Sequence, residues 1–236
     1  MPEFLIIALV VIGSYLFGNI NFALIIAKFR KVDLKKVGSG NLGTMNVTRN
    51  LGPWIGGLVL FLDALKGAIP CIIGWFFIGG IGFGEAVLSG IRLEVNPARL
   101  GAYIAGFSVI SGHIFPAFLK FKGGKGIAST IGITLVLQPF VALLSFAVAF
   151  TFISLTKMGS IASFIVISVP LAVEGFSLPV FTDQYALTSA IFIFLLFALA
   201  IFAHRSNVIK LFSGTESKTG IYKKKEKSKK NKKISF

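Results

Sequence analysis

The stretch FLIIALVVIGSYLFGNINFALIIAK, from Phe4 to Lys28, is almost entirely apolar and has the length of a membrane crossing. A helix needs about 20 predominantly apolar residues to span the hydrocarbon core of a bilayer. No basic segment precedes the run, and no cleavage site of small residues is evident before it ends, which distinguishes it from a secretory signal peptide. We therefore expect a retained first membrane span, and this expectation decides the class of fold.

Similar apolar runs recur along the chain, whose 236 residues are 55% hydrophobic with a mean hydropathy of +0.84. Further spans are predicted at about 54–78, 100–119, within 127–176, and at 186–203. The long region 127–176 must cross more than once, and Gln138-Pro139 and the segment 157–160 divide it into three pieces. The predicted fold is an all-α, polytopic membrane bundle of about seven helices, in which the piece 127–138 is short for a full crossing.

Positive charge is concentrated in a few segments. The formal net charge is +15, and 11 of the 24 Lys and Arg residues lie from His204 onward, while most of the others cluster at 28–49 and 120–125. Beside so many spans, the expected partner of these residues is an anionic lipid surface, and no nucleic acid is expected. We expect residues 1–216 to form the membrane domain and residues 217–236 to form a basic, disordered tail.

The distribution of charge also predicts the orientation. With seven spans, the basic segments 28–52 and 119–126, Lys157 and the tail fall on one side, which the positive-inside rule makes the cytoplasm. The N-terminus is then outside and the C-terminus cytoplasmic. The outer side should carry five of the nine acidic residues and two arginines: Glu3, Glu85, Glu94, Glu174, Asp183, Arg92 and Arg99.

Three polar segments share the predicted cytoplasmic side, and the first is VGSGNLGTMNVTRNLG, from Val37 to Gly52. Its glycines permit positive φ angles and let an anion approach backbone N–H groups, and Arg49 adds a charged, bidentate donor suited to phosphate. The candidate phosphate ligands before Arg49 are Gly38, Ser39, Gly40, Asn41, Gly43, Thr44 and Asn46. The same composition also suits a loop with helix caps, so this segment alone leaves both interpretations open.

The second segment is FKGGKGIAST, from Phe121 to Thr130. Gly123 and Gly124 precede Lys125, and a predicted helix begins directly after them, so backbone donors, a helix N-terminus and a lysine converge. We favour an anion site over a flexible basic loop. In the third segment, HRSNVIKLFSGTE, His204 and Asn207 lie one helical turn apart and can face the same site.

Two ionisable residues, Asp63 and Lys66, lie three apart inside the second predicted span. Charges within a span are costly and normally pair in the protein interior, so we expect an internal ion pair whose main role is structural. His113, in the third span, is expected to be a packed, hydrogen-bonded histidine rather than a catalytic base.

These motifs, in this order, resemble the acyl-phosphate:glycerol-3-phosphate acyltransferases of bacterial membranes over about residues 1–216. The first three parts of the resemblance are Gly-Ser-Gly-Asn-x-Gly-Ala-Thr-Asn-x-x-Arg at Gly38 to Arg49, Asp-x-x-Lys-Gly at Asp63 to Gly67, and Gly-His-x-Phe-Pro at Gly112 to Pro116. The others are Phe-x-Gly-Gly-Lys-Gly at Phe121 to Gly126, His-x-x-Asn at His204 to Asn207, and Gly-Thr-Glu at Gly214 to Glu216. The chain departs from the family pattern at Thr44-Met45, where the family has Ala-Thr, at Gly18 to Asn21, where it has Gly-Ser-Ile-Pro, and in its lysine-rich tail.

The resemblance implies transfer of a fatty acyl group from acyl phosphate to the 1-hydroxyl of glycerol 3-phosphate, giving lysophosphatidic acid and inorganic phosphate. This would be the first acylation of phospholipid synthesis, at the cytoplasmic face of a bacterial inner membrane. No cofactor or metal is implied, and a separate enzyme would supply the acyl phosphate.

The resemblance also assigns roles to residues. The catalytic candidates are Ser39, Arg49, Lys125 and His204. The candidates for substrate binding are Gly38, Gly40, Asn41, Gly43, Thr44, Asn46, Gly123, Gly124, Asn207 and Glu216. The general base is either His204 or an oxygen of a substrate phosphate.

Two other functions fit part of the sequence. A transporter of a phosphorylated metabolite would also use basic loops, glycine breaks and a buried Asp–Lys pair, although no internal repeat is found and the glycine-rich segments lie at the interface rather than at mid-membrane. A divergent paralogue with altered or lost activity would be explained by the change at Met45.

Overall fold

The structure is a computed structural model that describes residues 2–79, 97–177 and 186–215, and every regular element in these ranges is helical. The N-terminal half contains α1 (Glu3–Gly18), α2 (Phe22–Phe29), α3 (Thr44–Leu51) and α4 (Pro53–Gly79). The central part contains α6 (Pro97–Ile114), the 3-10 helix η1 (Ala117–Leu119), α7 (Ile127–Leu137) and α8 (Pro139–Thr156). The last helices are α9 (Gly159–Ser177), α10 (Ala186–Ala203) and α11 (Arg205–Phe212).

The described helices include six segments of membrane-spanning length and apolarity, and the seventh predicted helix, α7, is shorter. This confirms the all-α membrane bundle. It also confirms that the piece 127–138 is short for a full membrane crossing. The predicted breaks are also confirmed, because α7 ends at Leu137 before Pro139, and α8 and α9 are separated at Lys157 and Met158.

The sequence predicted one uninterrupted first span. In the structure this span divides into α1 and α2, with a break at Asn19 to Asn21. Asn19 Nδ2 donates to the carbonyl of Tyr15 at 2.6 Å, so its side chain bonds back to the end of α1. Asn21 Oδ1 accepts a hydrogen bond from the backbone N–H of Leu24 at 2.9 Å and caps the N-terminus of α2. Two asparagines therefore satisfy the backbone groups that the break exposes.

Helix α6 lies at the centre of the bundle and packs against α1, α4, α7 and α10. Small residues allow its backbone to approach α1 closely. A Cβ atom on Gly112 would lie 2.1 Å from the carbonyl oxygen of Tyr15, and one on Gly18 would lie 2.2 Å from that of Val109. Such close contacts between helix backbones are typical of membrane bundles, in which packing rather than water exclusion drives helix association.

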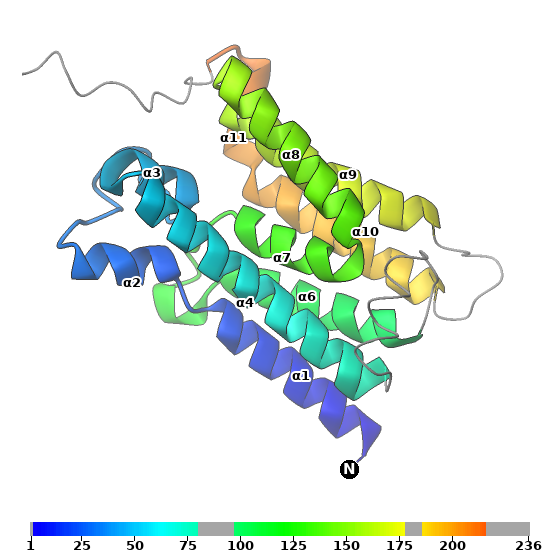
Figure 1. Ribbon diagram of the computed structural model, residues 1–236. Coiled ribbons are helices and arrows are strands. Elements are labelled where there is room, and N and C mark those ends of the chain that lie inside the picture. The colour runs from blue at the N-terminus through cyan, green and yellow to red at the C-terminus, as the bar shows by residue number, and fades with distance from the viewer. Residues whose placement is uncertain (1, 80–96, 178–185, 216–236) are drawn as a thin grey trace, which may run out of the picture.

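The polar segments gather at one end of the bundle. In Figure 1 the short helices α2, α3 and α11 lie at this end, which we call the loop end, whereas the N-terminus of α1 lies at the opposite end. The links between α6 and α7 and between α8 and α9 both begin where a helix reaches the loop end. The fold therefore brings the three polar segments together on one side.

Arg99 and Glu174, both expected on the outer side, form an ion pair inside the bundle. Both side chains are buried, and Arg99 Nη1 lies 2.8 Å from Glu174 Oε1. Tyr103 Oη and Gln138 Nε2 donate hydrogen bonds to the same carboxylate. A charge near the end of a span can turn inward when partners satisfy it, which a count of loop charges does not detect. Arg92, Glu85, Glu94 and Asp183 lie outside the described residues.

Candidate active site

A cavity of about 460 Å³ opens where the loop before α3, the link before α7 and four long helices meet. One part of its lining is polar and includes Asn41, Gly43, Thr44, Thr48, Asp63, His113 and Lys125. The other part is apolar and includes Leu60, Ile131, Phe146, Ala149, Phe150, Ile153, Ala162 and Val166. A cavity that joins polar groups to an apolar surface suits a molecule with a charged head and a hydrocarbon chain.

Two glycines of the first segment, Gly38 and Gly40, have the positive φ angles that the sequence led us to expect. Gly38 and Gly40 have φ angles of +59° and +68°, which residues with a Cβ atom rarely adopt. Gly43 differs, because its φ of −140° is ordinary extended backbone at the N-cap of α3. Gly43 nevertheless lines the cavity together with Asn41 and Thr44.

The buried side chain of Asn46 holds this loop in shape. Its Nδ2 atom lies 3.2 Å from the carbonyl oxygens of both Leu34 and Val37, and its Oδ1 atom accepts hydrogen bonds from Ser39 N and Asn50 Nδ2, each at 3.1 Å. The amide of Asn46 is thus engaged within the protein. Its contribution to a phosphate site is to fix the loop that carries the other donors.

The two catalytic candidates of the first segment, Ser39 and Arg49, are exposed and do not line the cavity. Arg49 lies one helical turn after Met45 on α3, so it is on the side of α3 whose residues Met45 and Thr48 do line the cavity. Thr44 and Met45, the positions that depart from the family pattern, both line the cavity, so this departure lies at the candidate site.

The second and third polar segments meet directly. Lys125 Nζ donates a hydrogen bond to Asn207 Oδ1 at 2.5 Å, across 82 positions of sequence. Gly124 is buried beneath the loop, and Gly123 and Lys125 are partly exposed. The predicted convergence of these segments is therefore observed, although Glu216 lies outside the described residues.

His204 is fully buried beside this contact and does not line the cavity. Its Nδ1 atom lies 2.9 Å from the carbonyl oxygen of Ala200, and its ring packs against Phe164 at a centroid distance of 5.6 Å. Burial lowers the pKa of His204 to about 4, and the nearby charge of Lys125 acts in the same direction, whereas the hydrogen bond to Ala200 opposes them. At neutral pH the ring is uncharged.

The sequence assigned Asp63 and Lys66 mainly a structural role. The structure shows in addition that Asp63 lines the cavity. Their predicted ion pair is present, with Lys66 Nζ 3.0 Å from Asp63 Oδ1. Asp63 and His113 both line the cavity, and His113 Nδ1 lies 2.8 Å from Lys66 Nζ. The signal for these residues was available in the motifs Asp-x-x-Lys-Gly and Gly-His-x-Phe-Pro.

Lys157 and Ser163 also line the cavity, and the sequence analysis did not select either as a site residue. They flank the turn between α8 and α9, far from any recognised motif. Only the three-dimensional path of these helices places them near the second segment.

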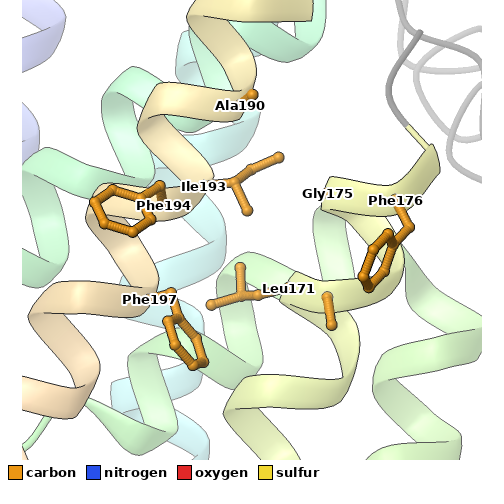
Figure 2. A pocket seen from close by; sticks show the side chains of 8 residues that line it. Leu171, Gly175, Phe176, Ala190, Ile193, Phe194 and Phe197 are labelled. Carbon is orange, nitrogen blue, oxygen red and sulfur yellow. The ribbon is translucent and has the colours of Figure 1, made fainter. Parts of the chain in front are cut away.

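A second cavity, of about 340 Å³, lies between α9 and α10 and differs in chemistry. Figure 2 shows Leu171 and Phe176 of α9 beside Ile193, Phe194 and Phe197 of α10. Its lining residues carry no polar side chain, so it has no means of holding a phosphate. The amphipathic cavity is therefore the candidate active site.

Comparison with known proteins gives the class of protein that this fold and site define. The family model described as glycerol-3-phosphate acyltransferase matches residues 8–214. The glycerol-3-phosphate acyltransferase of Thermoanaerobacter pseudethanolicus is 39% identical over 216 residues, covering 90% of this chain and 95% of the relative. That of Aquifex aeolicus is 37% identical over 206 residues, covering 87% and 95%.

Solved structures agree with the sequence comparison. The crystal structure of PlsY, an integral membrane glycerol 3-phosphate acyltransferase, in its glycerol 3-phosphate form aligns with a TM-score of 0.71 at 35% identity, covering 90% of this chain and 94% of that one. Its lysophosphatidic acid form gives a TM-score of 0.68 at 34% identity. The chain belongs to the glycerol-3-phosphate acyltransferase family and is a multi-pass membrane acyltransferase. The resemblance inferred from its motifs is confirmed.

Proposed function

We propose that this protein transfers a fatty acyl group from acyl phosphate to the 1-hydroxyl of glycerol 3-phosphate. The observation that carries the proposal is the single cavity in which Lys125 and a glycine-rich loop adjoin an apolar wall built by α7, α8 and α9. An acyl phosphate has the same division, with a dianionic head and a hydrocarbon chain. The glycerol 3-phosphate and lysophosphatidic acid forms of PlsY support the same substrate and product here.

The reaction balances without a cofactor. The 1-hydroxyl oxygen attacks the acyl carbonyl carbon, an ester bond forms, and the bond from that carbon to the phosphate oxygen breaks. The products are lysophosphatidic acid and inorganic phosphate, and the hydroxyl proton passes to a base. Because phosphate is a good leaving group, catalysis depends mainly on holding the two substrates together and stabilising developing charge.

The proposed roles follow the position of each group. Lys125, placed by the turn of Gly123 and Gly124, holds the head of the acyl phosphate and offsets charge on the leaving phosphate. Arg49 and Ser39, both exposed, bind the phosphate of glycerol 3-phosphate together with Asn41 of the cavity lining. Asn207, fixed against Lys125, orients the attacking alcohol.

We propose His204 as the base, a role that requires substrate binding to open a path to its buried Nε2 atom, because the ring does not line the cavity. Because a carbonyl accepts from its Nδ1, the ring proton is on Nδ1 and Nε2 keeps a free lone pair. Replacing His204 with Gln should lower kcat by about 10²–10⁴-fold, the usual contribution of a general base. Turnover near that of the natural chain would instead transfer this role to an oxygen of a substrate phosphate.

We propose a location in the bacterial inner membrane with the loop end in the cytoplasm, where soluble glycerol 3-phosphate is available. The basic residues of segments 28–49 and 120–125 support this orientation. A separate enzyme that makes acyl phosphate would supply the donor.

The deciding experiment measures release of inorganic phosphate by the purified protein in lipid or detergent. Palmitoyl phosphate would be supplied with and without glycerol 3-phosphate, beside an Arg49→Ala variant. We expect release that requires both substrates and is lost in the variant. Activity with palmitoyl-coenzyme A in place of palmitoyl phosphate would identify the thioester as the acyl donor. No turnover with either compound would favour the divergent paralogue.

A further inference from the structure

His113, in the last turn of α6, faces the site but has no role in the mechanism above. Its Nδ1 atom lies 2.8 Å from Lys66 Nζ. The same Nζ atom lies 2.6 Å from the carbonyl oxygen of Ile20 and 3.0 Å from Asp63 Oδ1. An ammonium has three donors, and these three contacts account for all of them.

These contacts determine the protonation of the imidazole ring. An ammonium group can only donate, so His113 Nδ1 must accept and the ring proton must lie on Nε2. A second ring proton would place a positive charge 2.8 Å from that of Lys66, in a buried setting where like charges repel strongly. His113 is therefore held as the neutral Nε2–H tautomer.

The Nε2–H group lies directly under the Gly-Gly-Lys turn. A Cβ atom on Gly124 would lie 2.3 Å from His113 Nε2, so only glycine fits above the ring. The turn is fixed to the end of α6 by hydrogen bonds from Gly124 N to the His113 carbonyl at 3.2 Å and from Gly123 N to the Ile114 carbonyl at 3.1 Å.

His113 and Lys125 both line the cavity, and among the described residues no hydrogen bond engages His113 Nε2. The lining passes from polar Lys125 to apolar Ile127 and Ile131 within the first turns of α7, which sets a boundary between the two kinds of lining. The carbonyl carbon of an acyl phosphate must lie at this same boundary, because it joins the phosphate to the hydrocarbon chain.

We propose that His113 is a fixed, neutral hydrogen-bond donor to an oxygen of the acyl phosphate, and that Lys66 acts through it as a positioning residue. The inference rests on the proposed function and adds a donor to the acyl-phosphate side of the site. The ring transfers no proton. It stabilises charge that develops on the donor's oxygens as the new ester bond forms.

The matched test compares His113→Gln with His113→Asn. The amide nitrogen of Gln can stand near the position of imidazole Nε2, whereas the shorter Asn places its amide near Nδ1 and leaves the donor position empty. With palmitoyl phosphate as the donor, we expect His113→Asn to lower kcat by about 10²-fold or more, the usual cost of losing one such donor. His113→Gln should recover most of this loss, and the KM for glycerol 3-phosphate should change little in either variant.

The shape of the pH profile provides a second readout. Since His113 does not titrate in its catalytic role, His113→Gln should keep the pH dependence of the natural chain. Loss of one limb of the profile in His113→Gln would overturn the proposal, because it would make the ring an acid or a base. Equal loss of kcat in both variants, or no loss in either, would also overturn it.

A measurement on the natural chain covers the case in which a variant fails to fold. The chain has two histidines, and ¹⁵N labelling of both rings would report their tautomers. We expect His113 as Nε2–H and His204 as Nδ1–H, both neutral from pH 6 to 8. A charged or Nδ1–H His113 would contradict the inference. Absence of turnover by the natural chain with any donor would instead count against the proposed function, whatever the tautomers.

Discussion

At the scale of single residues, the two histidines of this protein show how local contacts give one side chain type two opposite properties. His113 accepts at Nδ1 from a lysine and presents a donor at Nε2, whereas His204 donates at Nδ1 to a carbonyl and keeps a lone pair at Nε2. Both rings are buried. Their difference follows from the partner of Nδ1 alone, Lys66 in one case and Ala200 in the other.

The lowered pKa of His204 predicts a specific pH dependence of stability. The unfolded chain binds a proton at this ring below its ordinary pKa of about 6.5, while the folded protein does so only near 4. Between these values the unfolded state holds more protons, so the free energy of unfolding falls as the pH is lowered from about 6.5 towards 4 and is unaffected by this group above about 7.

Thermal unfolding in detergent at pH 7.5 and pH 5 would measure this contribution. On acidification, the midpoint temperature of unfolding should fall further in the natural chain than in His204→Gln, because the amide of Gln does not titrate. Equal losses in the two proteins would assign the acid sensitivity to other groups.

At the scale of elements, α7 is the helix that connects the site to the interior of the bundle. Its N-terminus follows the Gly-Gly-Lys turn, and its last carbonyl, that of Leu137, accepts a hydrogen bond from Arg99 Nη2 at 3.2 Å. Gln138, the next residue, donates to Glu174. The buried cluster of Arg99, Tyr103, Gln138 and Glu174 therefore satisfies the end of a helix that is too short to reach the far surface of a membrane.

Removing one partner of this cluster should be strongly destabilising. Arg99→Met leaves the Glu174 carboxylate buried without its counter-charge, which costs about 3–5 kcal/mol of unfolding free energy. The double variant Arg99→Met/Glu174→Gln should be more stable than Arg99→Met, because it removes the unpaired charge. Unfolding midpoints in a denaturing detergent titration would give all three values.

The exposed pair of Lys36 and Asp33 provides the matched control. Its charged atoms lie 3.8 Å apart, and the two side chains are 84% and 52% exposed. Lys36→Met should therefore change stability by about 1 kcal/mol or less. A similarly small effect of Arg99→Met would mean that the buried pair does not hold the end of α7.

The sequence predicted the elements better than it predicted their contacts. Span limits such as 186–203 were correct because an apolar run of 18 residues in a membrane has few alternatives to a helix, and Pro139 marked a break with its missing N–H. The break in the first span was missed because Asn19 and Asn21 act through hydrogen bonds that hydropathy does not record.

The same limit applies to the site. The motifs identified Lys125 and Asn207, whose side chains meet, because each lies in a polar segment on the predicted cytoplasmic side. They gave no indication of the apolar wall, since Phe146 and Val166 are indistinguishable in sequence from residues that face lipid. The sequence did not pair Arg99 with Glu174, 75 positions apart, because only the folded bundle brings them together.

At the scale of the whole molecule, the charge distribution predicts how the protein, and with it the site, is oriented in the membrane. Lys36 and Lys122 are exposed in the basic segments of the loop end, and Glu3 is exposed at the other end of α1. If the positive-inside rule governs insertion, the loop end and its cavity face the cytoplasm. Both substrates' phosphate groups would then be bound on the side where cells keep such metabolites.

Single cysteines tested in intact bacteria with a membrane-impermeant maleimide would decide this orientation. The natural chain is the control, because its one cysteine, Cys71, is fully buried and should not react. We expect Glu3→Cys to be labelled in intact cells, and Lys36→Cys and Lys122→Cys to be labelled only after the inner membrane is permeabilised. The reverse pattern would place the cavity on the outer side, where soluble glycerol 3-phosphate would have to be supplied from outside the cell. Labelling of all three positions in intact cells would indicate a mixed orientation, which a chain with 11 of its 24 Lys and Arg residues from His204 onward should strongly disfavour.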